Sequence, residues 1–316
     1  MIWNKEKTLL VSGASGPLGR RVVEILMDAE ERVIAATRTP EALSAFAARG
    51  AEVRRVNFDD PATLERAFEG VDRLVLSPRG APGRRLPRHL AVIDAAGRAG
   101  VEHVVYLSLS NAEEWKASFG REHAETEAAL RASGLGWTVL RNNLPADDLV
   151  TTLSNAIASG ELAAAAGGGA AGYVARDDSA AAAAAALASD DFDGRTIDVT
   201  GPAVVTHAEL ARIAGDISRS PVAYAPKSPE EMRKRLIAGG TSPEEADVLV
   251  SIDEAVATGW FQITTGAVEE LAGRPPVSVS ELLAENSDVL FSGAEPALTA
   301  RATPAVGARL GSPGSR

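Results

Sequence analysis

The stretch TLLVSGASGPLGRRVVEIL, residues 8–26, decides the fold expected of this chain. A short apolar run, typical of a buried parallel strand, leads into a glycine-rich turn and then into an amphipathic helix. The glycines lie at Gly13, Gly16 and Gly19. In this context the first allows a tight turn, the second lets backbone N–H groups approach a pyrophosphate, and the third lets the helix pack closely on the strand. The helix N-terminus adds a positive dipole end, so the stretch predicts a dinucleotide-binding turn. The alternative is a glycine-rich turn without a ligand.

The next expected strand, residues 32–38, ends at Thr37 and Arg38. An acidic residue at this tip would accept hydrogen bonds from the ribose hydroxyls of NAD. This chain has a guanidinium there instead, which suits the 2′-phosphate of NADP(H). We therefore predict NADPH as the cofactor. The alternative is that Arg38 is an ordinary exposed arginine at a strand end.

Strand and helix continue to alternate up to residue 141, which predicts an α/β fold with a Rossmann-type, doubly wound parallel sheet. A strand at residues 196–199 is expected to rejoin this sheet. We expect an NADP-binding domain over residues 1–145, with residues 193–205 returning to it. The further strands of that domain are expected at residues 52–56, 72–76, 104–107 and 137–140, and its later helices at residues 40–49, 61–68, 86–99 and 121–133.

The texture of the sequence changes after residue 145, and residues 146–290 are expected to form a smaller α/β substrate lobe. An alanine run at residues 180–186 predicts a tightly packed helix. From Phe291 the sequence lacks apolar periodicity, so residues 291–316 are expected to be a disordered tail. Other elements of the lobe are expected at residues 146–159, 206–217, 221–224, 229–237 and 243–258.

Composition limits the kinds of partner. The chain has 316 residues, of which 45% are hydrophobic, a net charge of −11 and no cysteine. The acidic balance argues against nucleic acid or an anionic membrane as a partner. The absence of cysteine excludes disulfides and thiolate chemistry, and it fits a reducing compartment. No apolar run approaches a membrane span, so we expect a cytoplasmic protein without a membrane partner.

The catalytic candidates follow the fifth strand, which ends at Ser108. Classical short-chain dehydrogenases carry a tyrosine acid in the next helix and a lysine four residues later. Here Phe119 takes the tyrosine position and His123 the lysine position, with Glu127 one helical turn beyond. Phenylalanine cannot donate a proton, so the usual Tyr–Lys relay is excluded. In the alternative interpretation, His123 is a buried histidine satisfied by Glu127, and Ser108 only bonds backbone.

These segments resemble the NmrA-like atypical short-chain dehydrogenases, and most of all their type 2 NAD(P)H:quinone oxidoreductases and triphenylmethane reductases. The resemblance rests on TLLVSGASGPLG, ATR, VVYLSL, REHAETEAALRASG, TVLRNN and TIDVTGPAVVTHAELARIAGDISRSPVAYAPKS. It covers about residues 8–283. It implies NADPH binding by the glycine turn, the basic strand tip and the loop after the fourth strand. The residues so implied are Gly13, Ser15, Gly16, Pro17, Leu18, Arg38, Ser77, Pro78 and Arg79.

The resemblance also places the nicotinamide near Ser108, His123 and residues 141–142, and the catalytic candidates are Ser108, His123 and Asn142. The candidates for contact with the substrate are Asn111, Trp115, Phe119, Arg141, Asn143 and Leu144. Trp115 and Phe119 have core packing as their alternative. The family's Arg-Asn-Gly-Trp-Tyr type loop is replaced by residues 141–145, RNNLP, so its stacking aromatics are missing.

The end of the third strand leaves two interpretations open. Asp59 or Phe58 lines an adenine pocket, or Asp60 merely caps the helix that follows. No residue pattern indicates a metal site.

The predicted function is an NADPH-dependent reductase that transfers hydride to a small conjugated acceptor, such as a quinone, an enone or an iminium-like compound. Two alternatives use the same fold. One is an NADP(H)-binding redox sensor that works without turnover, and the other is a redox-neutral tailoring enzyme, an epimerase or cyclase. A small-molecule substrate is the expected partner, together with a possible homodimer.

Overall fold

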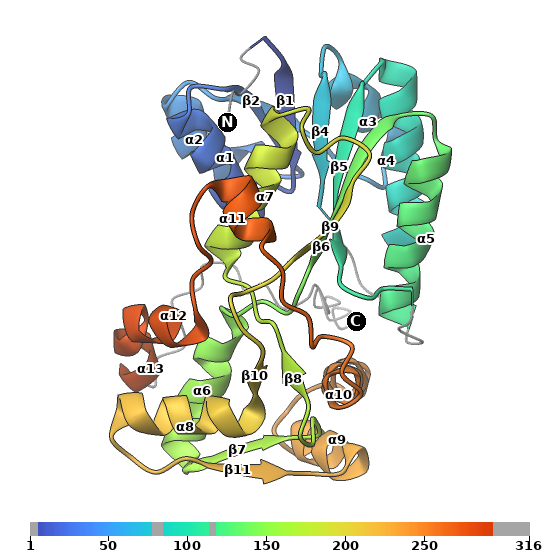
Figure 1. Cartoon of the computed structure of the whole chain (residues 1–316). Helices are drawn as coiled ribbons and strands as arrows, with labels where there is room; N and C mark the ends of the chain where they lie inside the picture. Colours follow the sequence, from blue (N-terminus) through green and yellow to red (C-terminus); the bar gives the residue numbers. More distant parts are fainter. Residues whose placement is uncertain (1–5, 78–84, 114–117, 293–316) are drawn as a thin grey trace, which may run out of the picture.

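The computed structural model describes residues 6–77, 85–113 and 118–292. A seven-stranded sheet forms the centre of its upper half (Figure 1), with every strand parallel to its neighbours. The strand order is β3-β2-β1-β4-β5-β6-β9, so the winding reverses between β1 and β4. The strands are β1 (Thr8–Ser12), β2 (Arg32–Thr37), β3 (Glu52–Arg55), β4 (Arg73–Leu76), β5 (His103–Leu109), β6 (Gly136–Asn142) and β9 (Thr196–Val199). This confirms the predicted fold class, including the return of residues 196–199.

Helices cover both faces of the sheet, as the buried strands require. One face carries α1 (Pro17–Asp28), α7 (Arg176–Ala188) and α11 (Ala267–Ala272). The other carries α3 (Pro61–Phe68), α4 (Arg85–Ala99) and α5 (Ser118–Ala132), which lie to the right in Figure 1. Each face has its own buried apolar cluster. The residues predicted as one helix at 40–49 form two pieces instead, a 3₁₀ turn η1 (Pro40–Leu43) and α2 (Ser44–Ala48).

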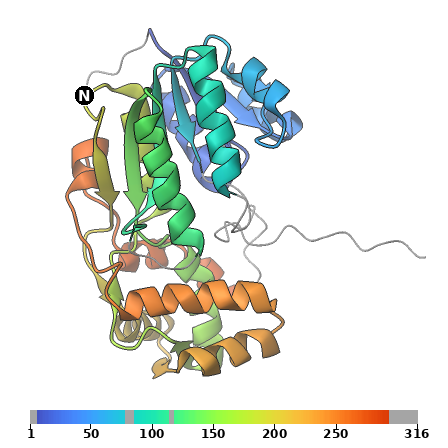
Figure 2. The same ribbon diagram turned by 90° about the vertical axis from the view of Figure 1, so that its right-hand side faces the viewer.

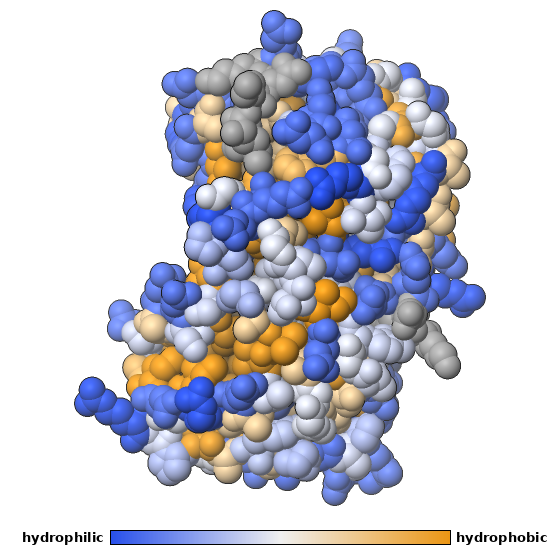
Figure 3. Space-filling view, viewed as in Figure 1, coloured by the Kyte–Doolittle hydropathy of each residue, from blue (hydrophilic) through white to orange (hydrophobic). Residues whose placement is uncertain are grey.

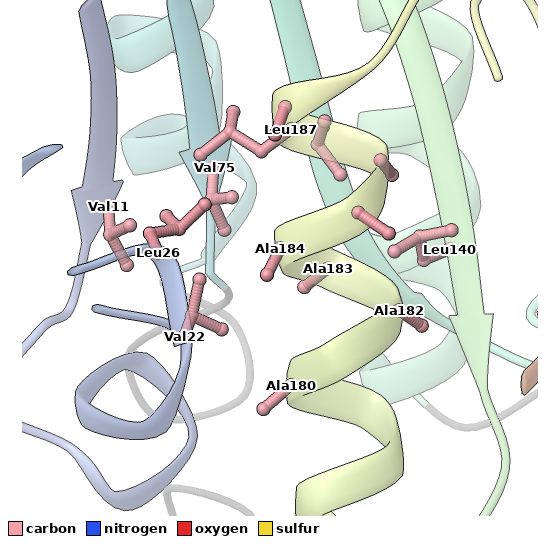
Figure 4. Packing of buried hydrophobic residues seen from close by; sticks show 14 of the residues in the cluster. Val11, Val22, Leu26, Val75, Leu140, Ala180, Ala182, Ala183, Ala184 and Leu187 are labelled. Carbon is pink, nitrogen blue, oxygen red and sulfur yellow. The ribbon is translucent and has the colours of Figure 1, made fainter. Parts of the chain in front are cut away.

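The alanine run forms the predicted helix, α7, at the centre of the first face. Figure 4 shows its alanines beside Val22 and Leu26 of α1 and near Val75 and Leu140 of the sheet. Because methyl side chains add little width, the helix lies close to its neighbours. Arg73, only 3% exposed, donates to the carbonyl oxygens of Ala186 and Ser189, both at 3.1 Å, and so satisfies the end of this helix.

The lobe lies below the carboxyl ends of the strands (Figure 1), and α9 and α10 form part of its base in the turned view (Figure 2). Its helices are α6 (Asp148–Ser159), α8 (His207–Ser218), α9 (Pro229–Ala238), α10 (Pro243–Ala257), α12 (Val279–Glu285) and α13 (Ser287–Ser292). Residues 162–172 are rich in alanine and glycine. They contribute to two small sheets, in which β7 (Glu161–Ala164) pairs with β11 (Ala223–Pro226) and β8 (Ala170–Ala171) with β10 (Val205–Thr206).

Surface character differs between the two halves. On the face viewed in Figure 3, hydrophilic side chains dominate the upper half, and apolar ones gather over the lobe. The helix α13 ends at Ser292, so Phe291 and Ser292 are helical where a disordered tail was predicted. The rest of the predicted tail lies outside the described residues. The proposed division near residue 145 stays a prediction. None of the helices in the described part of the chain has the length and apolarity to cross a membrane.

Candidate functional site

The glycine turn joins β1 to α1 at the carboxyl edge of the sheet, where the strand order reverses. Gly13 has a φ of +71°, and the N–H of Gly16 donates to its carbonyl oxygen at 2.9 Å. A Cβ on Gly19 would lie 2.5 Å from the same oxygen. The first glycine therefore makes the tight turn and the third permits the close approach of helix and turn, as predicted. Ligands bind at such switch points in parallel sheets.

The N-terminus of α1 has no side-chain cap. Gly16 stands at the N-cap, Pro17 takes the first helical position, and the first turn has no acidic residue. The N–H groups of Leu18 and Gly19 have no acceptor within the helix, since the first turn of any helix leaves its donors unused. Backbone donors and a positive dipole end therefore face the space beyond the turn, which suits a phosphate group.

The tip of β2 is tied to the glycine turn. The Thr37 hydroxyl donates to Ser15 Oγ at 2.8 Å, and the N–H of Ala14 donates to the carbonyl oxygen of Ala36 at 3.0 Å. Arg38 follows directly and is exposed. It forms no ion pair with any residue that the structure describes. A guanidinium with its charge uncompensated thus stands next to the turn.

Further candidate residues lie just beyond the ends of β3 and β4. Asp60 caps α3, accepting from the N–H of Ala62 at 3.2 Å, as one of the two interpretations expected. The carboxylate of Asp59 forms a two-pronged ion pair with Arg88, with both contacts at 2.6 Å. The N–H of Ser77 donates to Ser12 Oγ at 3.1 Å and joins β4 to β1. Pro78 and Arg79 lie outside the described residues.

A buried polar group, here called the β5–α5 cluster, consists of Tyr106, Ser108, His123, Glu127 and Arg141. Tyr106 and Ser108 come from β5, His123 and Glu127 from α5, and Arg141 from β6. The first four are each at most 5% exposed. Tyr106 bonds to His123, and Ser108 and Arg141 bond to Glu127, so these side chains are already hydrogen-bonded within the protein.

His123 lies in this cluster with Tyr106 as its partner, at 2.8 Å from Nδ1 to the phenolic oxygen. The alternative that made Glu127 its partner is therefore wrong, because the imidazole turns toward β5. Burial lowers the pKa of His123 well below its ordinary value, and electrostatic interactions with Arg85 and His89 act in the same direction. The ring is neutral at neutral pH. His89, which stacks edge-on against Tyr106, bonds Thr126 at 3.0 Å, and burial lowers its pKa to about 4.

Glu127 is completely buried and holds three partners. Ser108 Oγ donates to Oε1 at 2.6 Å, Arg141 Nη2 to Oε2 at 2.7 Å, and Arg131 Nη2 to Oε2 at 2.9 Å. Arg141 also pairs with Glu113. Ser108 was expected to bond backbone if it had no role in the site; its acceptor is a side chain instead. The hydrogen bond to Glu127 raises the pKa of Arg141 above its ordinary value.

The segment after β6 carries several candidates with different surroundings. Asn142 Oδ1 is buried and has no hydrogen-bond partner among the described residues. Such an atom is unusual, since buried acceptors are nearly always paired. Asn143 is 1% exposed, donates to the carbonyl oxygen of Phe261 and accepts from the N–H of Leu144. Its amide is therefore engaged within the protein. Leu144 is half-buried.

The remaining substrate candidates are placed only in part. Asn111 follows β5, and its Nδ2 donates to the carbonyl oxygen of Trp260 at 2.6 Å. The backbone of Phe119 belongs to α5, and its side chain is not described. Trp115 lies outside the described residues. Within those residues, no three histidine, aspartate or glutamate side chains come together as a metal ion would require.

Sequence reasoning missed two features of this site. It did not give Glu127 its role between β5 and β6, although a glutamate one turn beyond His123 was noticed. It also did not predict that the backbone of Trp260, in the segment between α10 and α11, is bonded to Asn111. A lone tryptophan in a loop carries no local signal, so only the fold could bring it here.

Comparison with known proteins places the chain in a family. A sequence profile described as NAD(P)H-binding matches residues 13–190. Quinone oxidoreductase 2 of Escherichia coli is 31% identical over 275 residues, covering 86% of this chain and 96% of that protein. A (4-alkanoyl-5-oxo-2,5-dihydrofuran-3-yl)methyl phosphate reductase of Streptomyces griseus is 32% identical over 287 residues, covering 89% and 98%.

Solved structures agree with these sequence matches. The crystal structure of the E. coli NADPH-dependent quinone oxidoreductase complexed with NADPH has a TM-score of 0.85 and 31% identity, covering 88% of this chain and 99% of that one. The structure of a Citrobacter triphenylmethane reductase complexed with NADP(H) has a TM-score of 0.83 and 30% identity, with the same coverage.

Proposed function

The chain belongs to the NmrA-like, NAD(P)H-binding family of oxidoreductases, and from this premise we propose that it transfers hydride from NADPH to a small conjugated acceptor. A quinone, an enone or an iminium-like dye is the class of acceptor we have in mind. The proposal rests on the turn that would hold the cofactor and on the surroundings of the candidate catalytic groups.

The residues at the turn fit NADPH. Gly13 and Gly16 leave the backbone bare where a pyrophosphate would approach, and the uncapped helix α1 offers its N–H donors. Arg38 would pair with the 2′-phosphate, because it is exposed and no described residue neutralises it. The bound cofactor supplies a hydride, and the protein's part is to hold and orient the reactants.

One observation supports the proposed class of acceptor. In the buried β5–α5 cluster the Tyr106 hydroxyl is bonded to the His123 imidazole and the Ser108 hydroxyl to the Glu127 carboxylate, and burial raises the pKa of Tyr106 and lowers that of His123. Neither group is poised to give a proton to a substrate. Acceptors whose reduced form is a stabilised anion need no such donor at the moment of transfer. Quinones and enones meet this condition, and simple ketones do not.

Asn142 is a polar side chain that keeps an unused acceptor in this region, counted over the described residues. Its Oδ1 is buried and unpaired among the described residues, at the carboxyl end of β6. We assign it the task of accepting a hydrogen bond from the carboxamide of the bound cofactor. Such a bond would orient the ring without taking part in proton transfer.

An assay of three acceptors tests the proposal. Loss of NADPH absorbance is followed with a quinone, an enone and a simple ketone side by side. We expect the first two to be reduced and the ketone to be left unchanged. Efficient reduction of the ketone would contradict the proposed acceptor class, since it requires an acid that the cluster does not offer.

One alternative has an observation in its favour. A protein that binds NADPH and signals through a partner also needs no acid, so the engaged β5–α5 cluster is compatible with a redox sensor. Cofactor affinity without NADPH oxidation across all acceptors would favour this function over the reductase. The homodimer and the cytoplasmic location expected from the sequence stay predictions.

A further inference from the structure

Two asparagines at the carboxyl ends of β5 and β6 hold one loop of the lobe by its backbone. Asn111 Nδ2 donates to the carbonyl oxygen of Trp260 at 2.6 Å, and Asn143 Nδ2 donates to that of Phe261 at 3.1 Å. Consecutive peptide groups are thereby fixed against the edge of the sheet where parallel strands present ligands. The loop is distant in sequence, and the two amide bonds bring it to the candidate site.

Asn111 adopts an uncommon backbone conformation to make this contact. Its φ is +52°, in the left-handed region, which asparagine enters more readily than most residues other than glycine. Conformations of this kind persist where the surrounding structure requires them, and they gather at functional sites. Here the conformation accompanies a side-chain bond that reaches from the sheet to the lobe.

Close contacts with Gly172 restrict the position of the loop that carries Trp260 and Phe261. The N–H of Gly172 donates to the carbonyl oxygen of Phe261 at 3.0 Å, and a Cβ on Gly172 would lie 2.1 Å from the carbonyl oxygen of Ile263. Phe261 is 1% exposed and belongs to the core of the lobe. Its neighbour Trp260 is consequently held at a defined place.

Trp260 differs from Phe261 in being only half-buried. It packs on the core of the lobe, and so do Leu109, the last residue of β5, and Leu144, which lies just beyond β6. None of the three is fully buried. All three pack on the same apolar cluster of the lobe, and the bonds from Asn111 and Asn143 place the backbone of residues 260 and 261 at the ends of β5 and β6, where the candidates Ser108 and Asn142 also lie.

We propose that Trp260 determines acceptor specificity, its indole ring providing the flat surface on which a planar acceptor stacks, and that Asn111 positions it. This inference rests on the proposed reductase function and names its preferred substrates, which are fused bicyclic quinones over monocyclic ones. Aromatic rings gain from offset stacking in proportion to their overlap, so the larger ring benefits more. The aromatic surface missing from residues 141–145 is then supplied by another segment.

The substitution Trp260→Ala is expected to raise KM for 1,4-naphthoquinone about tenfold, which corresponds to about 1.4 kcal/mol, and to raise KM for 1,4-benzoquinone less. The value of kcat should change little, because the ring binds and does not react. Trp260→Phe keeps a flat ring and should restore most of the affinity. Asn111→Gly keeps the backbone conformation and removes the amide, so it should raise KM in the same direction.

Binding is measured separately from turnover by quenching of tryptophan fluorescence with 1,4-naphthoquinone in the absence of NADPH. The chain has four tryptophans. Trp137, near the amino end of β6 and stacked on Arg131, gives the matched control Trp137→Phe. We expect Trp260→Phe to abolish most of the quenching and Trp137→Phe to leave it.

Equal quenching and equal KM in the parent and in a folded Trp260→Ala variant would overturn the assignment. Failure of the proposed function looks different. In that case no acceptor oxidises NADPH, whereas the quenching experiment still reports whether a planar ring reaches Trp260.

Discussion

Two regions at the carboxyl edge of the sheet differ in how their polar groups are used. At the glycine turn the donors are backbone N–H groups of a helix without a cap, and the nearby Arg38 has no ion-pair partner among the described residues. In the β5–α5 cluster, by contrast, Glu127 is completely buried and bound by Ser108, Arg141 and Arg131. The glycine turn therefore has hydrogen-bond donors available for a ligand, whereas the side chains of the β5–α5 cluster are bonded within the protein.

The difference teaches which groups can recognise a molecule and which can only hold the site together. A buried, fully paired carboxylate joins strands and helix, and losing one partner leaves a charge uncompensated. A helix N-terminus without a cap can bond to water when no ligand is present, and its N–H groups and dipole stabilise a phosphate when one binds. We therefore assign recognition to the turn and scaffolding to the cluster, and the following variants test that division.

Gly16→Val should have the largest effect. A side chain at this position would push the pyrophosphate from the turn, so we expect NADPH binding to weaken at least about 100-fold, or about 2.7 kcal/mol. Valine adopts the φ of −83° found here, and the fold should survive. Titration with NADPH measures the loss. Gly97→Val is the control, because a Cβ there meets open space. Unchanged NADPH affinity in a folded Gly16→Val protein would remove recognition from the turn.

Glu127→Ala should lower the free energy of unfolding by about 1–3 kcal/mol, because it leaves the buried Ser108 hydroxyl without its acceptor and the half-buried Arg141 with Glu113 as its remaining ion-pair partner among the described residues. Urea denaturation measures this change. Glu125→Ala on the same helix is the control; Glu125 pairs with Arg121 at the surface, where one substitution changes stability by about 0.5 kcal/mol or less. If both variants were equally stable, the cluster would not be the scaffold we infer.

Arg38→Asp should reverse the cofactor preference by removing a charge-assisted contact worth about 1.5–3 kcal/mol, or about 10–150-fold in affinity. The parent protein should prefer NADPH to NADH, and the variant NADH. Arg32→Asp, at the opposite end of β2, is the matched control and should keep the parent's preference. Parallel titrations with both cofactors decide the matter, and equal affinities in the parent would refute the role of Arg38.

The smallest expected effect is the pH dependence of stability that comes from His89. Burial lowers the pKa of His89 to about 4, so the folded protein binds fewer protons than the unfolded chain between pH 6.5 and 4. The stability from this group is present above pH 6.5 and falls as the pH drops, by about 1 kcal/mol between pH 6.5 and 5.5. Raised pKa values at Asp148 and Asp253, about 7 and about 6, act in the opposite sense. The difference between parent and His89→Gln isolates the histidine; a difference independent of pH would disprove its neutral burial.

Local rules predicted the turn better than the cluster. The tight turn at Gly13, the close approach at Gly19 and the helix at residues 180–186 all follow from neighbouring residues and were found as expected, and the Asp60 cap was one of two interpretations left open. The alternative that paired His123 with Glu127 was wrong, because that residue is one turn away in sequence, whereas the partner found, Tyr106, lies across from it on a strand.

Contacts between distant segments had no signal in the sequence. Asn111 reaches Trp260 over 149 positions, and Asn143 reaches Phe261 over 118. Such pairs depend on how the lobe packs against the sheet, and the spacing of residues in the sequence does not determine that packing. The roles in catalysis and binding given to the candidate residues remain predictions.

The alanine helix α7 has a consequence for how this protein tolerates change. Its side chains are almost all buried, with Ala181 the one alanine of the helix that is not fully so. Nearly any substitution adds atoms, and overpacking a tight core typically costs about 1–3 kcal/mol. The alanine run should therefore be among the segments that tolerate substitution least. Within the run, mutational scans should find that larger side chains are tolerated best at Ala181.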